Sequence, residues 1–420
     1  MLGPSRRPYR HGGALCPAPS FPPRRKDLRQ TGVCGIVDIE PLLATEETHQ
    51  VFGDSSKRSI LFWARNEMNY IVFRPIHRRL RGDPRVSISF TGSRNEGRSC
   101  AELYERAGAG AVRLASERLS RYRRHDLFVA ADSSRPRTRA RARVMLYHGV
   151  SPKNWFAKPG LRYDRYFVYG NYMRRRVAKS NGWDEEDPRL VMVGFPKVDC
   201  LVDGSLDADE IRRELGLDTS RPTVTYAPTH NLYSDSSLSV SGREIIRTLV
   251  DMPVNVVVKL HSARLSPSAG GIDWAAALTE WDAPNLSLAL GYDSCPYLYV
   301  ADVLISDVSS VAWEFSLLDR PIIYYHVPGL LAEIRRRGTE VDKDPWGMRA
   351  GAVVRDCRGL RAEVERALED PSERSDVRRA MATDLFHEPG AATERAVAAL
   401  YDAMGLDAPD GVPLRDGVRR

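Results

Sequence analysis

The sequence predicts an α/β protein with two doubly wound domains, each a parallel sheet with helices on both faces. Three observations lead to this prediction. The chain of 420 residues is longer than a single hydrophobic core usually supports. Short apolar runs rich in β-branched and aromatic residues alternate with helix-forming segments. A polar, charged stretch at 201–219 divides these runs into two series, and we place the domain boundary there.

Ordered structure is expected to begin near Ile36, and the first series of elements extends to residue 193. Apolar runs predict strands at 59–63, 86–90, 126–131, 142–147, 165–170 and 190–193. Helices are expected at 66–73, 101–119 and 171–180. Proline lacks the backbone N–H that a helix interior needs, so Pro75 is expected to end the first helix. No GxGxxG string follows these strands, which argues against an ordinary dinucleotide-binding domain.

The second series follows a charged helix expected at 209–215. Strands are predicted at 223–229, 254–260, 286–289, 303–306, 322–325 and 351–354. Further helices are expected at 244–250, 296–299, 360–368, 376–385 and 392–404. A serine-rich loop is expected at 234–241. This repeated alternation is typical of a second parallel sheet.

The stretch 303–325 carries the most informative local pattern. A buried strand ending at Ser306 precedes a Ser309–Ser310 turn, a short helix with an apolar face, and a second buried strand. This order indicates a compact βαβ unit. Either serine is a good N-cap, and N–H groups at such a helix start bind anions, above all phosphates. The alternative is that the serines only cap the helix.

His148 and Gly149 follow the strand expected at 142–147. Ligands of open α/β sheets bind at the carboxyl ends of strands, and glycine lets the backbone turn there. Because imidazole titrates near neutrality, His148 is a candidate general base. The alternative is a turn histidine that is only hydrogen-bonded. His148, His261, Thr229 and the Ser309–Ser310 turn would then face one another across a cleft between the domains, an arrangement suited to joining two substrates.

The net charge of +7 and the pI of about 9.1 favour anionic partners. Many of the arginines occur in clusters, for example at 174–176. Solvated surfaces explain most such clusters, and an anionic membrane surface is a second explanation. Nucleic acid is not an expected partner, because no recognition motif accompanies the charge.

Six scattered cysteines without CxxC or metal-ligand spacing indicate reduced thiols in a cytoplasmic protein. No run of 18 apolar residues is present, so no membrane span is expected. Residues 1–35, rich in proline and arginine, are expected to be a disordered or wrongly annotated extension, and residues 405–420 a frayed tail.

From about Arg143 to Leu400 the sequence resembles the CDP-glycerol glycerophosphotransferases, which build teichoic-acid-type polymers. The order and spacing of several short strings carry the resemblance. These strings are His148-Gly149, Gly194-Phe195-Pro196-Lys197-Val198-Asp199, Tyr226-Ala227-Pro228-Thr229, Lys259-Leu260-His261, Ser306-Asp307-Val308-Ser309-Ser310, Pro321-Ile322-Ile323-Tyr324-Tyr325, Arg337-Gly338 and the segment from Gly390 to Arg395.

The resemblance implies a GT-B-like fold with the active site in the cleft between two Rossmann-like domains. Residues 36–204 would form the acceptor domain and residues 221–390 the CDP-donor domain, followed by a terminal helix at 391–404. The implied reaction moves glycerol phosphate, or a related polyol phosphate, from a CDP-activated donor to a lipid-linked or polymer acceptor. The implied location is cytoplasmic, peripheral on the inner face of the cell membrane.

The resemblance also implies roles for individual residues. His148 would take the proton of the acceptor hydroxyl, and His261 would contact or protonate the diphosphate as CMP leaves. The donor's phosphates and nucleotide would be held by Thr229, Asp307, Ser309, Ser310, Gly149 and Arg264. Aligned donors of this kind suit phosphoryl transfer. No cofactor is implied, and the sequence leaves a requirement for a divalent metal ion open.

The sequence departs from the family's usual pattern at two places. His230-Asn231 follows Thr229 where an aromatic residue and an arginine are usual, and Ser262 replaces a proline after His261. These departures leave the transferred polyol open. Two other functions also remain open: a glycosyltransferase or epimerase that uses a UDP-sugar, and a nucleotide-binding scaffold without catalytic activity.

Overall fold

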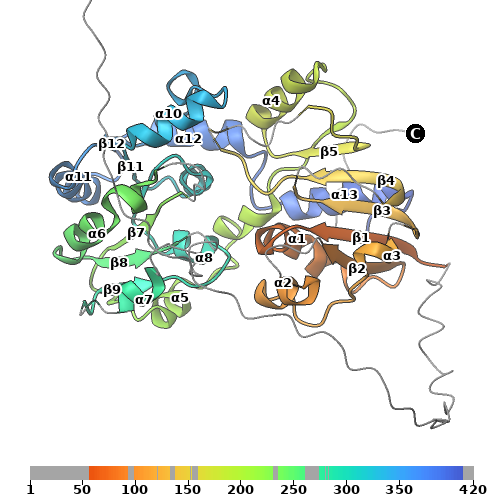
Figure 1. Cartoon of the computed structure of the whole chain (residues 1–420), viewed down its shortest axis with the longest axis horizontal. Helices are drawn as coiled ribbons and strands as arrows, with labels where there is room; N and C mark the ends of the chain where they lie inside the picture. Colours follow the sequence, from red (N-terminus) through yellow and green to blue (C-terminus); the bar gives the residue numbers. More distant parts are fainter. Residues whose placement is uncertain are drawn as a thin grey trace, which may run out of the picture. The chain divides into compact units, whose positions relative to one another are not determined.

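The computed structural model describes residues 56–92, 99–120, 122–132, 138–151, 153, 159–229, 235–260, 274–279, 281 and 283–409. Two six-stranded sheets, in which all strand pairs are parallel, make up the fold (Figure 1). Both sheets belong to one compact unit, Phe52–Arg420. The expected extension at 1–35, the expected start of order near Ile36 and most of the expected tail lie outside the described residues.

The first sheet has the strand order β2-β1-β3-β4-β5-β6. Its strands are β1 (Arg58–Ala64), β2 (Val86–Gly92), β3 (Arg124–Ala130), β4 (Arg139–Leu146), β5 (Arg165–Val168) and β6 (Leu190–Met192). The helices of this part of the chain are α1 (Glu67–Leu80), α2 (Cys100–Arg106), α3 (Glu117–Ser120), α4 (Asn171–Asn181), the 3-10 helix η1 (Pro196–Leu201) and α5 (Ala208–Glu214).

The second sheet has the order β12-β11-β10-β7-β8-β9. Its strands are β7 (Thr223–Ala227), β8 (Asn255–Val258), β9 (Leu286–Leu288), β10 (Val303–Ser306), β11 (Ile322–Tyr325) and β12 (Ala352–Val354). Its helices are α6 (Ser237–Val250), α7 (Trp274–Thr279), α8 (Cys295–Tyr299), α9 (Ser310–Phe315), η3 (Ser316–Leu318), α10 (Pro328–Arg336), η4 (Val341–Lys343) and α11 (Cys357–Glu369). The predicted α/β class with two parallel sheets is confirmed.

The last two helices, α12 (Ser375–Leu385) and α13 (Ala392–Met404), return to the first sheet. Helix α12 contacts α4, and α13 contacts α1, β3 and β4 (Figure 1). The apolar side of α13, with Val397, Leu400 and Met404, is fully buried. The carboxyl-terminal end of the chain therefore completes the core under the sheet formed by its beginning.

The main hydrophobic core is shared between the two sheets. It contains Phe62 and Phe167 from the first sheet together with Leu304, Trp313 and Tyr324 from the second half of the chain. A second cluster lies within the second half and includes Val224, Ile305 and Ile323. Because apolar burial is the main stabilising contribution to folding, the shared core couples the two halves energetically.

The prediction that the first helix ends at Pro75 was wrong. Helix α1 continues to Leu80, with Pro75 inside it. Ile76 and Leu80, which follow the proline, are fully buried. Burial of two such side chains stabilises the fold by roughly 3–6 kcal/mol, which exceeds the cost of about 3 kcal/mol for a proline inside a helix.

Two further predictions of local structure were wrong in part. The helix expected at 101–119 is split into α2 and α3, and the segment between them carries two glycines, which lower helix propensity by about 1 kcal/mol each. The serine-rich loop expected at 234–241 contains the start of α6. Ser236 caps that helix, since its side chain accepts from the backbone N–H of Ser239 and the Ser239 side chain accepts in return.

Candidate active site

The candidate site lies at the carboxyl edge of the second sheet. Strands β7 and β10 are neighbours there, and the chain leaves them toward opposite ends of the sheet. Such a reversal of strand order opens a crevice at the carboxyl ends, where open α/β sheets bind ligands. Thr229 lies shortly after β7, and Asp307 follows β10 directly. Both residues were predicted site residues, and the fold brings them together.

Asp307 joins three segments at this point. Its side chain is almost fully buried and accepts hydrogen bonds from the backbone N–H of Thr229 (2.7 Å), the backbone N–H of Ser237 (3.0 Å) and the Ser237 hydroxyl (2.8 Å). Burial raises the pKa of Asp307, although Ser237, Lys153 and Thr229 favour the charged form. The carboxylate thus orients Thr229 and Ser237. Ser309 donates its backbone N–H to the backbone carbonyl oxygen of Asp307, at 3.0 Å.

Ser309 and Ser310 form the start of α9, as the sequence predicted. Ser309 has extended backbone angles and its hydroxyl accepts from the backbone N–H of Val311, at 3.4 Å. This is the geometry of an N-cap. Ser309 is buried and Ser310 is half-buried. The capping role of Ser309 is therefore confirmed, whereas phosphate binding by the two serines stays a prediction.

His148 follows β4 of the first sheet and is exposed. Its Nδ1 lies 3.0 Å from the backbone carbonyl oxygen of Ala131, the residue after β3. A carbonyl oxygen only accepts, so Nδ1 carries the proton and donates it to this bond. In the neutral ring Nε2 is then the unprotonated nitrogen. The carbonyl of Ala131 thus fixes the tautomer that a general base would need.

Gly149 lies beside the start of α9. Its φ of +155° is one that residues with a side chain rarely adopt. A methyl group placed on Gly149 would lie 3.8 Å from both Cβ and Oγ of Ser310. The end of a strand in the first sheet therefore meets the serine turn of the second sheet. Gly149, the residue after His148, therefore lies next to Ser310.

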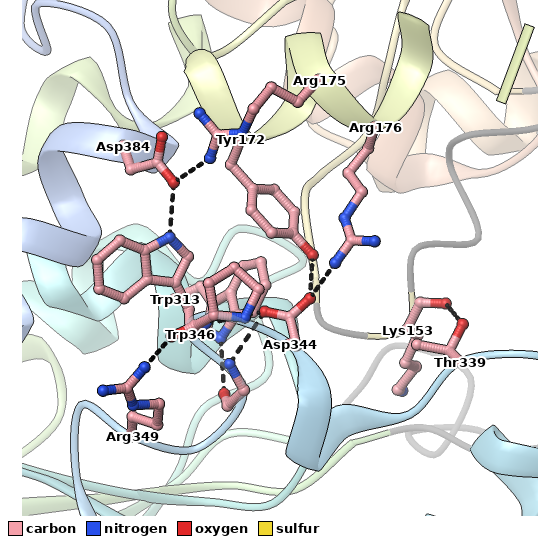
Figure 2. A network of polar contacts seen from close by, with 12 residues as sticks. Lys153, Tyr172, Arg175, Arg176, Trp313, Thr339, Asp344, Trp346, Arg349 and Asp384 are labelled. Carbon is pink, nitrogen blue, oxygen red and sulfur yellow. Dashed lines mark hydrogen bonds and ion pairs between the residues drawn. The ribbon is translucent and has the colours of Figure 1, made fainter. Parts of the chain in front are cut away.

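Lys153 is a buried residue on the loop after Gly149, and the sequence indicated only a basic loop there. Its Nζ donates to the hydroxyl of Thr229, at 2.5 Å. Its backbone carbonyl accepts from the hydroxyl of Thr339, at 3.0 Å (Figure 2). Burial lowers the pKa of Lys153 to about 8, and the charge of Asp307 acts in the opposite direction. The only indication in the sequence that Lys153 belongs to the site was its position shortly after His148. Its bond to Thr229 in the second half of the chain depends on the fold.

Two predicted site residues, His261 and Arg264, lie outside the described residues, as do the departures at His230, Asn231 and Ser262. The residue before Leu260, Lys259, is described and buried. Its Nζ donates to the carbonyl of Leu260, at 2.8 Å. Burial and the neighbouring charge of Lys197 lower the pKa of Lys259 to about 8.

Two of the strings that carry the resemblance contact each other and build the fold. The Asp199 carboxylate accepts from the backbone N–H groups of Gly390 (2.9 Å), Ala392 (3.0 Å) and Thr393 (2.7 Å) and from the Thr393 hydroxyl (2.8 Å). In return, Arg395 Nε donates to the carbonyl of Val193, at 3.0 Å. These residues fix the start of α13 rather than lining the candidate site.

A buried aspartate, Asp344, organises a polar network between α4 and the loop before β12. It accepts from the Tyr172 hydroxyl (2.5 Å) and from Arg176 Nη2 (2.8 Å) (Figure 2). Its other oxygen accepts from the backbone N–H groups of Trp346 (3.0 Å) and Gly347 (3.1 Å). This network supports the part of the chain that carries Thr339.

The arginines at 174–176 form ion pairs with acidic residues of the same chain. Arg174, Arg175 and Arg176 pair with Glu186 (3.1 Å), Asp384 (2.7 Å) and Asp344 (2.8 Å), respectively. Since each side chain has an acidic partner, this cluster supplies little charge to an external surface. In the described part of the chain, no helix has the length and apolar character to cross a bilayer, and no group of three or more His, Cys, Asp or Glu side chains is placed to hold a metal ion.

Comparison with known proteins places these features in a family. Residues 144–401 match the family described as CDP-Glycerol:Poly(glycerophosphate) glycerophosphotransferase. A teichoic acid glycerol-phosphate primase of Bacillus spizizenii is 27% identical over 226 residues, covering 50% of this chain and 54% of the relative. A teichoic acid poly(glycerol phosphate) polymerase of Staphylococcus epidermidis is 24% identical over 185 residues, covering 41% of this chain and 24% of the relative. The chain thus spans about half or less of the length of these relatives.

A solved structure of a variant of the wall teichoic acid polymerase TagF has a TM-score of 0.60 at 16% identity, covering 83% of this chain and 88% of that chain. At this identity the likeness shows the fold alone, and it confirms the expected GT-B-like architecture. The family match extends over more than half of the sequence and includes His148, Gly149, Lys153, Thr229, Asp307, Ser309 and Ser310. The chain belongs to the CDP-glycerol:poly(glycerophosphate) glycerophosphotransferase family.

Proposed function

We propose that this protein transfers glycerol phosphate, or a related polyol phosphate, from a CDP-activated donor to a hydroxyl of a lipid-linked or polymer acceptor, with release of CMP. The product would be a cell-surface polymer. The observation that carries the proposal is the position of Gly149 beside Ser310, at the switch point of the second sheet. The residue before Gly149 is a histidine whose tautomer is fixed by Ala131, in a chain of this family.

The acceptor half of the reaction depends on His148. The acceptor oxygen attacks the phosphorus that bears the glycerol, and its proton passes to Nε2 of His148. The bond from that phosphorus to the bridging oxygen breaks, and its electron pair leaves with CMP. The Ala131 carbonyl holds the Nδ1 proton throughout, which keeps Nε2 available as the base.

The donor half of the reaction depends on the second sheet. The hydroxyls of Thr229, Ser309 and Ser310 would donate to phosphate oxygens, and Asp307 holds Thr229 in place through its backbone N–H. His261 would contact or protonate the leaving phosphate, and Arg264 would add positive charge. Fixed donors aimed at developing negative charge provide most of the catalysis in phosphoryl transfer.

The test is release of CMP by the purified protein with CDP-glycerol, CDP-ribitol and a panel of UDP-sugars, with and without a lipid-linked acceptor. We expect acceptor-dependent release from a CDP-polyol, and a loss of at least about 100-fold in His148→Ala. CDP binding and thermal unfolding of this variant should stay unchanged, since His148 acts on the acceptor side.

Three results would contradict the proposal. CMP release that survives in His148→Ala would remove the histidine from its role as base. Release of UDP or UMP would favour a glycosyltransferase or epimerase. Tight nucleotide binding without turnover of any donor would favour a scaffold.

The acceptor's membrane supplies a second partner in this proposal. The amino ends of parallel strands share one edge, and at this edge of the first sheet Arg124, Arg139, Arg141 and Arg162 are exposed. We place an anionic bilayer there, which would make the protein peripheral on the cytoplasmic face of the membrane. The edge is opposite His148, and strand β4 of 8 residues separates the two by roughly 26 Å. An extended acceptor chain would span this distance.

Vesicle binding tests the membrane partner. We expect binding to anionic vesicles that weakens with salt, and a loss of at least about tenfold in the triple variant Arg139→Gln, Arg141→Gln, Arg162→Gln, since each well-placed arginine contributes about 1 kcal/mol. The matched control changes three exposed arginines outside the first sheet, Arg213→Gln, Arg355→Gln and Arg358→Gln. Equal binding to neutral and anionic vesicles, or equal losses in both variants, would rule this surface out.

A further inference from the structure

Lys153 reaches from the first half of the chain into the candidate site of the second. The residue is only 7% exposed, and its Nζ donates to the hydroxyl of Thr229, at 2.5 Å. Thr229 in turn is held by Asp307 at the switch point between β7 and β10. Lys153 lies on the loop that follows β4 of the first sheet, and its ammonium group therefore reaches the carboxyl edge of the second sheet.

A buried ammonium group at this place suits an anionic ligand. Taking a lysine out of water costs free energy, and at Lys153 the effect of burial outweighs the charge of Asp307, so a further negative charge beside Nζ would be favourable. Phosphate oxygens provide both charge and acceptors, and bonds between ammonium and phosphate are stronger than those between neutral groups. The adjacent hydroxyl of Thr229 is a donor for the same kind of ligand.

We propose that Lys153 is a ligand of the donor's diphosphate and stabilises the negative charge that collects on the bridging oxygen as the nucleotide leaves. The inference rests on the proposed function and adds a residue from the acceptor half to the donor site. The ligand class is a nucleoside diphosphate.

The same contact would couple donor binding to the position of the base. The loop that begins with His148 is attached to the second half at Lys153. Its Nζ donates to Thr229, and its carbonyl accepts from the Thr339 hydroxyl, as Figure 2 shows for the second bond. A diphosphate bound to Nζ would hold this loop more firmly. His148 would then be placed for the acceptor only when the donor is present.

The experiment measures the affinity of CDP for the full chain by calorimetry between pH 6.5 and 9.5, without acceptor. Lysine is charged below its pKa, and that of Lys153 is about 8. We therefore expect CDP binding by the wild-type protein to weaken as the pH rises through about 8. Lys153→Met should bind CDP at least about tenfold more weakly at pH 7 and show no such decline.

Lys153→Arg gives a second readout that does not depend on the stability of Lys153→Met. A guanidinium stays charged across this range, so the variant should keep CDP binding within a few-fold and lose the decline near pH 8. The matched control is Lys179→Met on α4, which removes the same charge from an exposed position and should bind CDP like the wild type.

Other groups face this site and define the outcomes that would overturn the inference. Asp307 lies at the end of β10, and Lys259 after β8 also has a pKa of about 8. If the decline in CDP affinity near pH 8 persists in Lys153→Arg, another group such as Lys259 causes it. Unchanged CDP affinity in a folded Lys153→Met would refute binding by Lys153. Wild-type protein that binds CDP without transferring glycerol phosphate would refute the function alone, and absence of CDP binding would refute both.

Discussion

At the scale of single residues, buried carboxylates organise this protein by accepting several backbone N–H groups at once. Asp307 does so at the candidate site and Asp199 at the start of α13. Both belong to strings that carry the family resemblance, yet neither side chain has to touch a substrate to matter. A string typical of a family therefore identifies the family more securely than it identifies ligand-binding residues.

Gly194 is a second residue whose importance comes from close packing. Its φ is +84°, and a Cβ there would lie 2.6 Å from the carbonyl oxygen of His387 and 2.8 Å from the Cβ of Ala392. Gly204 also has a positive φ, of +76°, but has open space around it. Both glycines have a positive φ, and they differ in burial and in what a side chain would meet.

We predict that Gly194→Ala lowers the free energy of unfolding by about 2–4 kcal/mol, from backbone strain plus overpacking. Gly204→Ala should cost about 1 kcal/mol, from strain alone. Urea unfolding followed by circular dichroism measures both values. Equal losses of unfolding free energy in the two variants would show that the close approach of His387 adds no cost for a side chain at position 194.

At the scale of elements, α13 depends on contacts with chain segments far from it in the sequence. Asp199 accepts from the N–H groups at its start, Glu394 pairs with Arg79 of α1 (3.1 Å), and the Tyr401 hydroxyl donates to Asp83 (2.7 Å). Negative charge at a helix start is favourable, because unpaired N–H groups and the helix dipole point there.

Asp199→Ala should lower the free energy of unfolding by about 3 kcal/mol, because buried N–H groups of Gly390, Ala392 and Thr393 lose their acceptor. Asp203→Ala is the control, since its exposed carboxylate accepts only from the N–H of Ser205 among the contacts described. It should change stability by less than about 1 kcal/mol. Denaturant unfolding of both variants provides the comparison, and a similar small effect at both positions would argue against the cap.

At the scale of the whole molecule, one buried ion pair joins the two halves of the chain. Lys197 Nζ of η1 lies 2.6 Å from Glu314 Oε2 of α9, and each side chain is 2% exposed. Nζ also donates to the Ser294 hydroxyl, at 3.0 Å. Burial alone lowers the pKa of Lys197, but Glu314 and other neighbours outweigh it, so that the pKa is raised. Helix α9, which starts at the serine turn, is thus fixed from the first half.

Lys197→Met should destabilise the fold by about 3–5 kcal/mol, because Glu314 is left buried without its partner. The double variant Lys197→Met, Glu314→Leu should recover most of this loss. A double-mutant cycle in denaturant measures the coupling. Since the raised pKa keeps Lys197 charged, the pair's contribution should be constant from pH 6 to 9, and it should fall as the pH rises from the unfolded-state lysine pKa of about 10.4 to the raised folded-state pKa. Additive single effects would show that the pair contributes no coupling.

The sequence alone determined the fold class and most strand positions. Runs such as 303–306 and 322–325 are apolar on both faces, and only strands covered by helices on both sides remain buried in this way. Placement of His148, Thr229 and Asp307 at strand ends also followed from the pattern, because carboxyl ends of parallel strands share an edge. Helix α1 beyond Pro75 did not follow, since burial of later residues decides it.

The tertiary structure decided which strand ends meet. The contact of Gly149 with Ser310, the bond from Lys153 to Thr229 and the pairing of Arg176 with Asp344 each join residues more than 70 positions apart in the sequence. Local propensity and periodicity act over a turn of helix or a strand and carry no information on such pairs. The packing of a core shared by both sheets sets these distances, and with them the geometry of the candidate site.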